Sequence, residues 1–216
     1  MLKISNIVRT IIAQNEEALV ALNDGYLNMS AYGEKIKKEV EKQTKKAVKL
    51  GTIVAALNRL KGKIQTSVPS RSKLKIEDLA VKTGLSELTY ENTSAITSKA
   101  KQLLSEGKID NEGILFICQG IREVSFFVFE KNRKTIEDNF KKVKPKFVKN
   151  DLVSLTVRLA DEAIPYPNHT YTVLRALVMK KISVIDNITT YSELTFILEA
   201  TDLHPAMEAI NNLMKG

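Results

Sequence analysis

The chain has 216 residues, of which 44% are hydrophobic and 27% charged, a composition that is typical of a folded protein and excludes an intrinsically disordered one. It has a single cysteine, Cys118, so no intramolecular disulfide can form, and its longest apolar stretches are far shorter than the roughly 18 residues that a membrane span requires. We therefore expect a cytoplasmic protein without a membrane span or a signal peptide, and Cys118 within an apolar run is expected to be a buried, unreactive thiol.

The formal net charge of +8 is unevenly distributed along the chain. Residues 1–72 carry 13 basic and 6 acidic side chains, residues 73–149 carry 15 and 11, and residues 150–216 carry 5 and 8. The three segments therefore have net charges of +7, +4 and −3. The excess of positive charge in the first third indicates an anionic partner for that part of the chain.

Residues 1–64 are expected to form a domain of three short helices. Apolar residues recur at spacings of three and four from Ile4 to Leu22, which predicts one amphipathic helix or a broken pair. A second helix is expected to begin at Ser30 as its N-cap, and a third at Gly51-Thr52. Residues 65–72 are polar and aperiodic and contain a proline, so we expect a linker there.

Beyond the linker, short alternating runs typical of strands are separated by helical stripes. Val153–Leu159 and Leu194–Leu198 alternate as strands do, and the last third is predicted to run strand, helix, strand, strand, helix. A shift of seventy positions places Glu123–Phe126 on Glu193–Phe196. This match predicts an internal repeat, with one copy at 73–149 and the other at 150–216.

Four runs of the last third match a known kind of regulatory domain. They are Ser154–Leu159, Pro165–His169, Ile182–Ile188 and Tyr191–Leu198. Together they resemble an ACT domain of the aspartokinase type. The resemblance implies an α+β protein in which the helical domain is followed by two ferredoxin-like, ACT-type βαββα sandwich units, the first of them divergent.

The resemblance also implies a ligand site. Domains of this type are regulatory, and they commonly bind amino acids between two copies, through the loop after the first strand and through the second strand. Carried over residue by residue, the ligand-binding residues are Asp161, Pro167, Asn168, His169, Thr170, Asp186, Asn187 and Ile188. Asn168 stands where the family usually has glycine. The alternative is that the loop is a solvated connection and that the domain has lost its ligand.

The fourth strand with which this fold normally ends is missing after the last helix, where only Lys215 and Gly216 follow. An unpaired strand edge attracts another strand. We expect the second copy to pair with the first, whose last strand is predicted at Lys146–Val148, or with a second chain. A homodimer or higher oligomer through the sheet edges is therefore predicted.

Lysines crowd the predicted second helix and the turn after it, directly before the helix that begins at Thr52. This order resembles a helix-turn-helix or winged-helix domain, which implies double-stranded DNA as a partner. The nucleic-acid-binding residues are then Lys42, Lys45, Lys46, Lys49, Thr52, Ala55, Arg59 and Lys63. Three alternatives stay open: a solvated face with the ion pairs Glu34–Lys38 and Glu41–Lys45, a protein-docking domain, and a dimerisation module.

Signatures of catalysis are missing from the sequence. It contains no GxxxxGK[ST] loop, GxGxxG, HExxH or closely spaced cysteine pair, so we expect neither an enzyme nor a bound cofactor or metal. The first hypothesis is a ligand-responsive regulatory protein that binds a small metabolite, such as an amino acid, and acts through DNA binding by its N-terminal helical domain. The second is a free-standing regulatory subunit whose helical head docks on an amino-acid biosynthetic enzyme.

Overall fold

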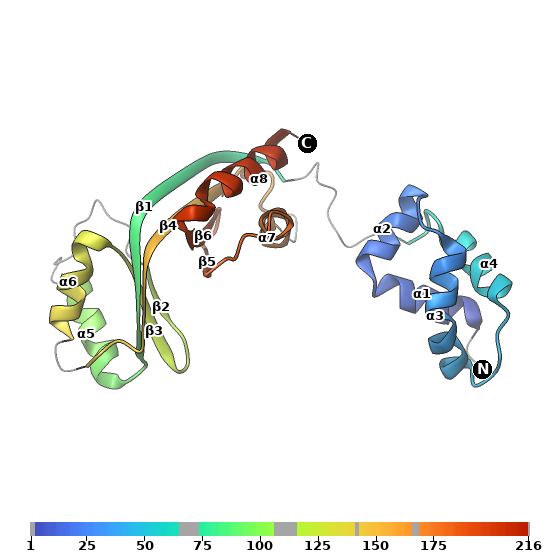
Figure 1. Cartoon of the computed structure of the whole chain (residues 1–216), viewed down its shortest axis with the longest axis horizontal. Helices are drawn as coiled ribbons and strands as arrows, with labels where there is room; N and C mark the ends of the chain where they lie inside the picture. Colours follow the sequence, from blue (N-terminus) through green and yellow to red (C-terminus); the bar gives the residue numbers. More distant parts are fainter. Residues whose placement is uncertain (1–2, 65–73, 106–115, 141–142, 166–168, 216) are drawn as a thin grey trace. The chain divides into compact units, whose positions relative to one another are not determined.

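A computed structural model describes residues 3–64, 74–105, 116–140, 143–165 and 169–215. The chain divides into two compact units, Met1–Ser70 and Arg71–Gly216 (Figure 1). The predicted linker at 65–72 lies outside the described residues. Within the described ranges, no helix has both the length and the apolar character that a membrane span needs.

Over its described residues, 3–64, the first unit contains helices and no strand. They are α1 (Ile4–Ala13), α2 (Glu16–Asp24), α3 (Met29–Thr44) and α4 (Leu50–Leu60). The predicted apolar stripe from Ile4 to Leu22 belongs to two successive helices and not to one. The Asn15 side chain accepts a hydrogen bond from Ala18 N and so caps the start of the second helix. The expectation of three helices was therefore wrong, since four are present.

The start of α3 also differs from the prediction. Asn28, and not Ser30, caps this helix, because its side-chain oxygen accepts a hydrogen bond from Ala31 N at 3.0 Å. All four helices contribute to one buried core, whose largest members are Ile7, Ile12, Leu19, Leu22, Tyr32, Ile36, Ile53 and Leu57.

The second unit is a six-stranded antiparallel sheet with helices, in the strand order β2-β3-β1-β4-β6-β5. Along the chain its elements are β1 (Ile76–Glu91), α5 (Ser94–Ser105), β2 (Phe116–Gln119), β3 (Glu123–Phe129), α6 (Glu130–Asn139), β4 (Phe147–Leu159), α7 (His169–Met179), β5 (Asp186–Thr189), β6 (Glu193–Glu199), a short 3-10 helix (Ala200–Asp202) and α8 (Leu203–Lys215). This α+β arrangement is consistent with ACT-like units. The order predicted for the last third, strand, helix, strand, strand, helix, is confirmed.

The internal repeat appears in the strand register. Cys118 faces Ser125 across β2 and β3, and Ile188 faces Thr195 across β5 and β6. Each position in the second pair is seventy residues beyond its counterpart, as the sequence shift predicts. Figure 1 shows the same relation between helices, with α5 and α6 beside the half that contains β2 and β3, and α7 and α8 beside the half that contains β5 and β6.

The two longest strands, β1 and β4, join these halves. Residues 85–91 of β1 pair with β3, whereas residues 76–82 pair with the part of β4 that also pairs with β6. The beginning of β1 is thus the fourth strand of the second half. The predicted pairing with the first copy is confirmed. Lys146–Val148, predicted as the last strand of the first copy, overlaps the start of β4 and completes the first half as expected.

Apolar side chains fill both faces of the sheet. One core lies under α7 and α8 and includes Leu155 and Phe196, and another lies under α5 and α6 and includes Tyr90 and Phe126. On the face without helices, a third cluster is formed by Leu85, Phe127, Leu152 and Ile197, against which Phe116, Cys118, Phe129, Ile185 and Ile188 pack.

Figure 1 shows that β1 follows a curved path. Burial raises the pKa of the Cys118 thiol on β2. The long strands deviate from regular pairing at two places. The register shifts between Lys82 and Leu85, where Gly84 has a φ of 70°, and again between Leu85 and Glu87, opposite Asp151 with a φ of 55°.

Candidate functional site

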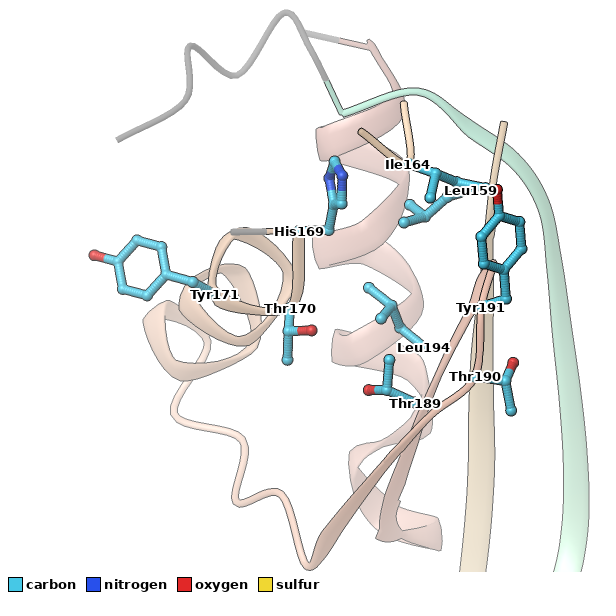
Figure 2. A pocket seen from close by; sticks show the side chains of 9 residues that line it. All are labelled: Leu159, Ile164, His169, Thr170, Tyr171, Thr189, Thr190, Tyr191 and Leu194. Atoms are coloured by element: carbon cyan, nitrogen blue, oxygen red, sulfur yellow. The ribbon is translucent and has the colours of Figure 1, made fainter. Parts of the chain in front are cut away.

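A cavity of about 450 Å³ lies at one end of the second half of the sheet. Its walls come from the end of β4 and the loop after it, the first turn of α7, and the hairpin that joins β5 to β6 (Figure 2). The lining residues are Leu159, Ile164, His169, Thr170, Tyr171, Thr189, Thr190, Tyr191 and Leu194. This volume is in the range of small-molecule sites.

Strand pairing brings these segments together. Leu159 N donates a hydrogen bond to Ser192 O at 2.8 Å, which fixes the hairpin tip beside the end of β4. Thr190 N donates to Glu193 O at 2.9 Å and closes the turn. Because side chains alternate along a strand, Leu159, Thr189 and Leu194 all lie on the face of the sheet that the helices cover.

The polar groups of the cavity include an imidazole, three threonine hydroxyls and a helix N-terminus. Nε2 of His169 is buried and has no hydrogen-bond partner among the described residues. The first turn of α7 contains no acidic side chain, and the first N–H groups of a helix have no partner within it. The hydroxyls are those of Thr170, Thr189 and Thr190, of which Thr189 Oγ1 is 3.4 Å from Asn187 Oδ1.

The remaining wall is apolar and aromatic. Leu159, Ile164 and Leu194 are aliphatic, and Tyr191 at the hairpin tip is 82% exposed. Figure 2 shows the imidazole of His169 on the same side of the cavity as Ile164, whereas Tyr171 extends away from the other eight residues. The cavity therefore combines hydrogen-bonding groups with aliphatic side chains.

The structure places the predicted ligand residues in several different environments. His169 and Thr170 line the cavity, and Pro167 and Asn168 lie outside the described residues. Asp161 is exposed and does not line the cavity. Asp186 and Ile188 lie on the opposite face of the sheet, where Ile188 packs against the third cluster.

Asn187 points to the helix-covered face but is not part of the cavity wall, because its Nδ2 donates to Thr195 O at 3.3 Å. Sequence reasoning did not select Thr189, Thr190 and Tyr191. The turn before Glu193 could have pointed to these three residues. It forms the tip of the β5–β6 hairpin, which lies at the end of the sheet where β4 ends and α7 begins.

The first half of the sheet has a different arrangement at the corresponding place. Asn92 N donates to Arg122 O at 2.8 Å, as Leu159 N does to Ser192 O. The side chain of Asn92 donates to Gly120 O at 2.7 Å and accepts from Thr97 Oγ1 at 3.1 Å. Only two residues separate β1 from α5, so the side chain of Asn92 links the β2–β3 hairpin to α5 through these two hydrogen bonds.

In the helical unit, the predicted nucleic-acid-binding residues lie on α3, on α4 and on the turn between them, except for Lys63, which follows α4. Ala55 is half-buried, and the exposed ones are Lys42, Lys45, Lys46, Lys49, Thr52, Arg59 and Lys63. Lys45 adopts a left-handed conformation, with a φ of 55°, and ends α3. The geometry thus exposes a run of cations over the α3–α4 turn.

The ion pairs considered for this face are not formed within residues 3–64. Glu41 does not pair with Lys45, because its Oε1 accepts a hydrogen bond from Val48 N at 2.9 Å and so stabilises the turn. Lys38 likewise has no carboxylate partner among the described residues of this unit. The two ion pairs considered for this face are therefore absent from residues 3–64, while the alternative of a solvated lysine face stays open.

The described residues contain no group of three or more histidine, cysteine, aspartate or glutamate side chains placed to hold a metal ion.

Comparisons with known proteins point to one fold. No protein-family model matches the sequence, and no curated protein matches it. Among solved structures, the regulatory subunits of aspartate kinase from Thermus thermophilus and Thermus flavus are similar, at 13% and 14% identity and a TM-score of 0.53. The matches cover 64% of this chain and 97% and 98% of those chains.

A complete aspartate kinase gives the same result over part of its length. E. coli aspartokinase III in complex with aspartate and ADP matches at 10% identity and a TM-score of 0.52, over 66% of this chain and 34% of that chain. This chain therefore spans about a third of the whole enzyme. At these identities the likeness shows the fold alone. Each match covers more residues than the helical unit of seventy residues contains, so it includes the sheet unit.

Proposed function

We propose that the chain is a ligand-responsive regulatory protein. The second half of the sheet unit binds a small metabolite in the cavity at the start of α7, and the helical unit transmits the response by binding double-stranded DNA. The observation that carries this proposal is the cavity itself, in which a buried imidazole nitrogen with no partner among the described residues lies beside a helix N-terminus. We further propose that the protein is cytoplasmic, is not an enzyme, and assembles through its sheet edges.

The fold supports a regulatory role. Regulatory subunits of aspartate kinase share it over nearly their whole length. Their likeness makes amino acids the first compounds to test, with His169 and Thr170 as contacts. Asp161, Pro167, Asn168, Asp186, Asn187 and Ile188 remain candidate contacts for a ligand bound between two copies.

A thermal-unfolding screen of the full chain against the twenty amino acids and common nucleotides tests ligand binding. A compound that binds only the folded state, at about 100 times its Kd, adds roughly 2.7 kcal/mol to the free energy of unfolding. We expect at least one compound to raise Tm, and His169→Phe to abolish the shift. His204→Phe is the matched control, because His204 is exposed at the start of α8. No shift with any metabolite would refute the ligand site.

The unpaired lysines support DNA as the second partner. Cations without internal carboxylate partners are free to neutralise phosphates, and each neutralised phosphate releases counterions. The α4 surface beside them offers Thr52, Ala55 and Arg59 as small and basic groups that can approach a groove.

Fluorescence anisotropy with duplex DNA at several salt concentrations tests this part of the proposal. We expect affinity to fall steeply with salt, and the combined change of Lys45, Lys46 and Lys49 to Gln to flatten the slope of log K against log salt. A control variant with Lys101, Lys134 and Lys144 changed to Gln removes the same charge from exposed positions of the other unit. Equal slopes for both variants would refute a specific role of the α3–α4 turn.

Regulation requires coupling between the two activities. A ligand changes DNA binding only if it has different affinities for two states of the protein, and DNA must then change ligand affinity by the same factor. Equal DNA affinity with and without a confirmed ligand would reduce the protein to an uncoupled DNA-binding protein.

A second candidate function is a free-standing regulatory subunit whose helical unit docks on an amino-acid biosynthetic enzyme. The Thermus matches favour it, because those regulatory subunits are themselves separate chains that are covered almost completely. Affinity purification of the tagged full chain distinguishes the candidates: co-purified nucleic acid that is lost at high salt supports the first, and a stoichiometric enzyme supports the second.

A further inference from the structure

We infer that the ligand of the cavity is a small organic acid with a carboxylate and an uncharged aliphatic body, without the ammonium group of an amino acid. The inference rests on the proposed ligand-binding function and specifies the chemistry of that site. It follows from which polar groups surround the cavity and from where the nearby acidic residues lie.

The donors of the cavity fit a carboxylate. A carboxylate accepts hydrogen bonds and carries negative charge. The site offers Nε2 of His169, which donates in the tautomer that protonates this nitrogen, and the start of α7, an eleven-residue helix without an acidic residue in its first turn. The hydroxyl of Thr170 lies in the same turn. Since Nε2 of His169 is buried and has no partner among the described residues, a bound acceptor would remove the cost of leaving it unpaired.

An ammonium group finds no matching charge. None of the nine lining residues is acidic. In the loop after β4, Asp161 is exposed, and Glu162 pairs with Lys75 at 2.5 Å. On β5 and β6, Asp186 and Glu193 lie on the other face of the sheet, because their neighbours in sequence point to the helix-covered face. A buried cation without a carboxylate partner would pay its full desolvation penalty.

The rest of the cavity fits an aliphatic body. Leu159, Ile164 and Leu194 form a surface of branched aliphatic side chains, and Leu194 also belongs to the core under α7 and α8. Apolar contact with such a surface stabilises a bound ligand in proportion to the area removed from water. Branched 2-oxo acids combine this body with a carboxylate, and they differ from the matched amino acids at one position only.

Isothermal titration of the full chain with two matched pairs tests the inference. The pairs are 4-methyl-2-oxopentanoate with L-leucine and 3-methyl-2-oxobutanoate with L-valine. We expect the oxo acid of each pair to bind at least about tenfold more tightly than its amino acid. His169→Phe should weaken oxo-acid binding by about tenfold or more, the usual effect of losing a hydrogen bond to a charged group, while His204→Phe leaves it unchanged.

The outcomes separate this inference from the function on which it rests. If leucine, valine or any compound of the amino-acid and nucleotide screen binds as tightly as the oxo acids, the inference is wrong and the ligand site stands. If neither the oxo acids nor any screened compound binds, the proposed ligand site itself is wrong, and the inference falls with it. Equal effects of His169→Phe and His204→Phe would also overturn the assignment of the carboxylate to this cavity.

Discussion

Replacement of Tyr90 by phenylalanine is expected to stabilise the sheet unit. Tyr90 lies in the core under α5 and α6, is 0% exposed, and its hydroxyl has no hydrogen-bond partner among the described residues. Its ring contacts Phe126 edge-to-face at a centroid distance of 5.8 Å and Phe140 at 4.8 Å. Phenylalanine keeps both ring contacts and removes only the hydroxyl.

The size of the gain follows from the cost of an unpaired hydroxyl. Burying such a group without a partner costs about 1–3 kcal/mol in mutational studies. We expect Tyr90→Phe to raise the free energy of unfolding by about 1 kcal/mol at pH 8, because some relaxation around the hydroxyl lowers its cost. For a unit of this size the corresponding increase in Tm is about 3 °C.

The advantage of the variant should grow at alkaline pH. Burial, with a further contribution from the carboxylate of Glu137, raises the pKa of Tyr90 to about 12. Between pH 10 and pH 12 the unfolded chain has therefore lost a proton that the folded protein keeps. Stability falls by about 1.4 kcal/mol per pH unit in that window for the tyrosine, and the phenylalanine variant lacks this loss.

Urea unfolding followed by circular dichroism at pH 8 and pH 11 measures both effects. Tyr26→Phe is the control, because Tyr26 is 68% exposed and lies in the helical unit. A variant that is less stable than the parent at pH 8, or whose advantage is the same at both pH values, would refute the reasoning, since the hydroxyl would then have a partner such as a buried water.

Three further predictions concern stability and can be measured in the same way. Phe127→Ala empties a fully buried position of the cluster on the helix-free face, so we expect a loss of about 3–5 kcal/mol and one common transition for both halves of the sheet; two separated transitions would contradict it. Gly84→Ala should cost about 1 kcal/mol from its φ of 70° alone, because an added Cβ meets no atom within 4 Å; a cost near 3 kcal/mol would indicate a clash instead. Asn15→Ala removes the cap of α2 and should destabilise the helical unit by about 1 kcal/mol, whereas an unchanged transition would show that the cap is dispensable.

Much of the sheet unit could be predicted from periodicity. The strands β4 and β6 alternate over their buried lengths, and the repeat appears in both sequence and register. The full length of β1 could not be predicted, because the alternation of its apolar residues changes phase at the irregular pairing around Gly84. Before it, the odd-numbered Leu79 and Val81 pack under α7 and α8, and after it the even-numbered Leu88 and Tyr90 pack under α5 and α6. No local pattern signals such a change.

The cavity could be predicted only in part. The resemblance selects the start of α7, where His169 and Thr170 lie, but it extends the candidate contacts to alternate residues of β5 that point to the other face of the sheet. Thr190 and Tyr191 belong to a hairpin tip, and only the pairing of Leu159 with Ser192 brings that tip to the cavity. Contacts of this kind depend on tertiary pairing and leave no mark in the spacing of residues. Whether any of these side chains binds a ligand stays a prediction.

The shared strands β1 and β4 determine how the protein can be cut. A fragment that begins at Asp151 would keep α7, the cavity and α8. It would lack residues 76–82 of β1, however, so the edge of β4 that pairs with them would be unpaired. A usable ligand-binding fragment must instead be built as a permuted chain, with residues 74–82 joined after Lys215 by a short linker. Biosensor designs based on this protein should therefore start from that rearranged order of segments.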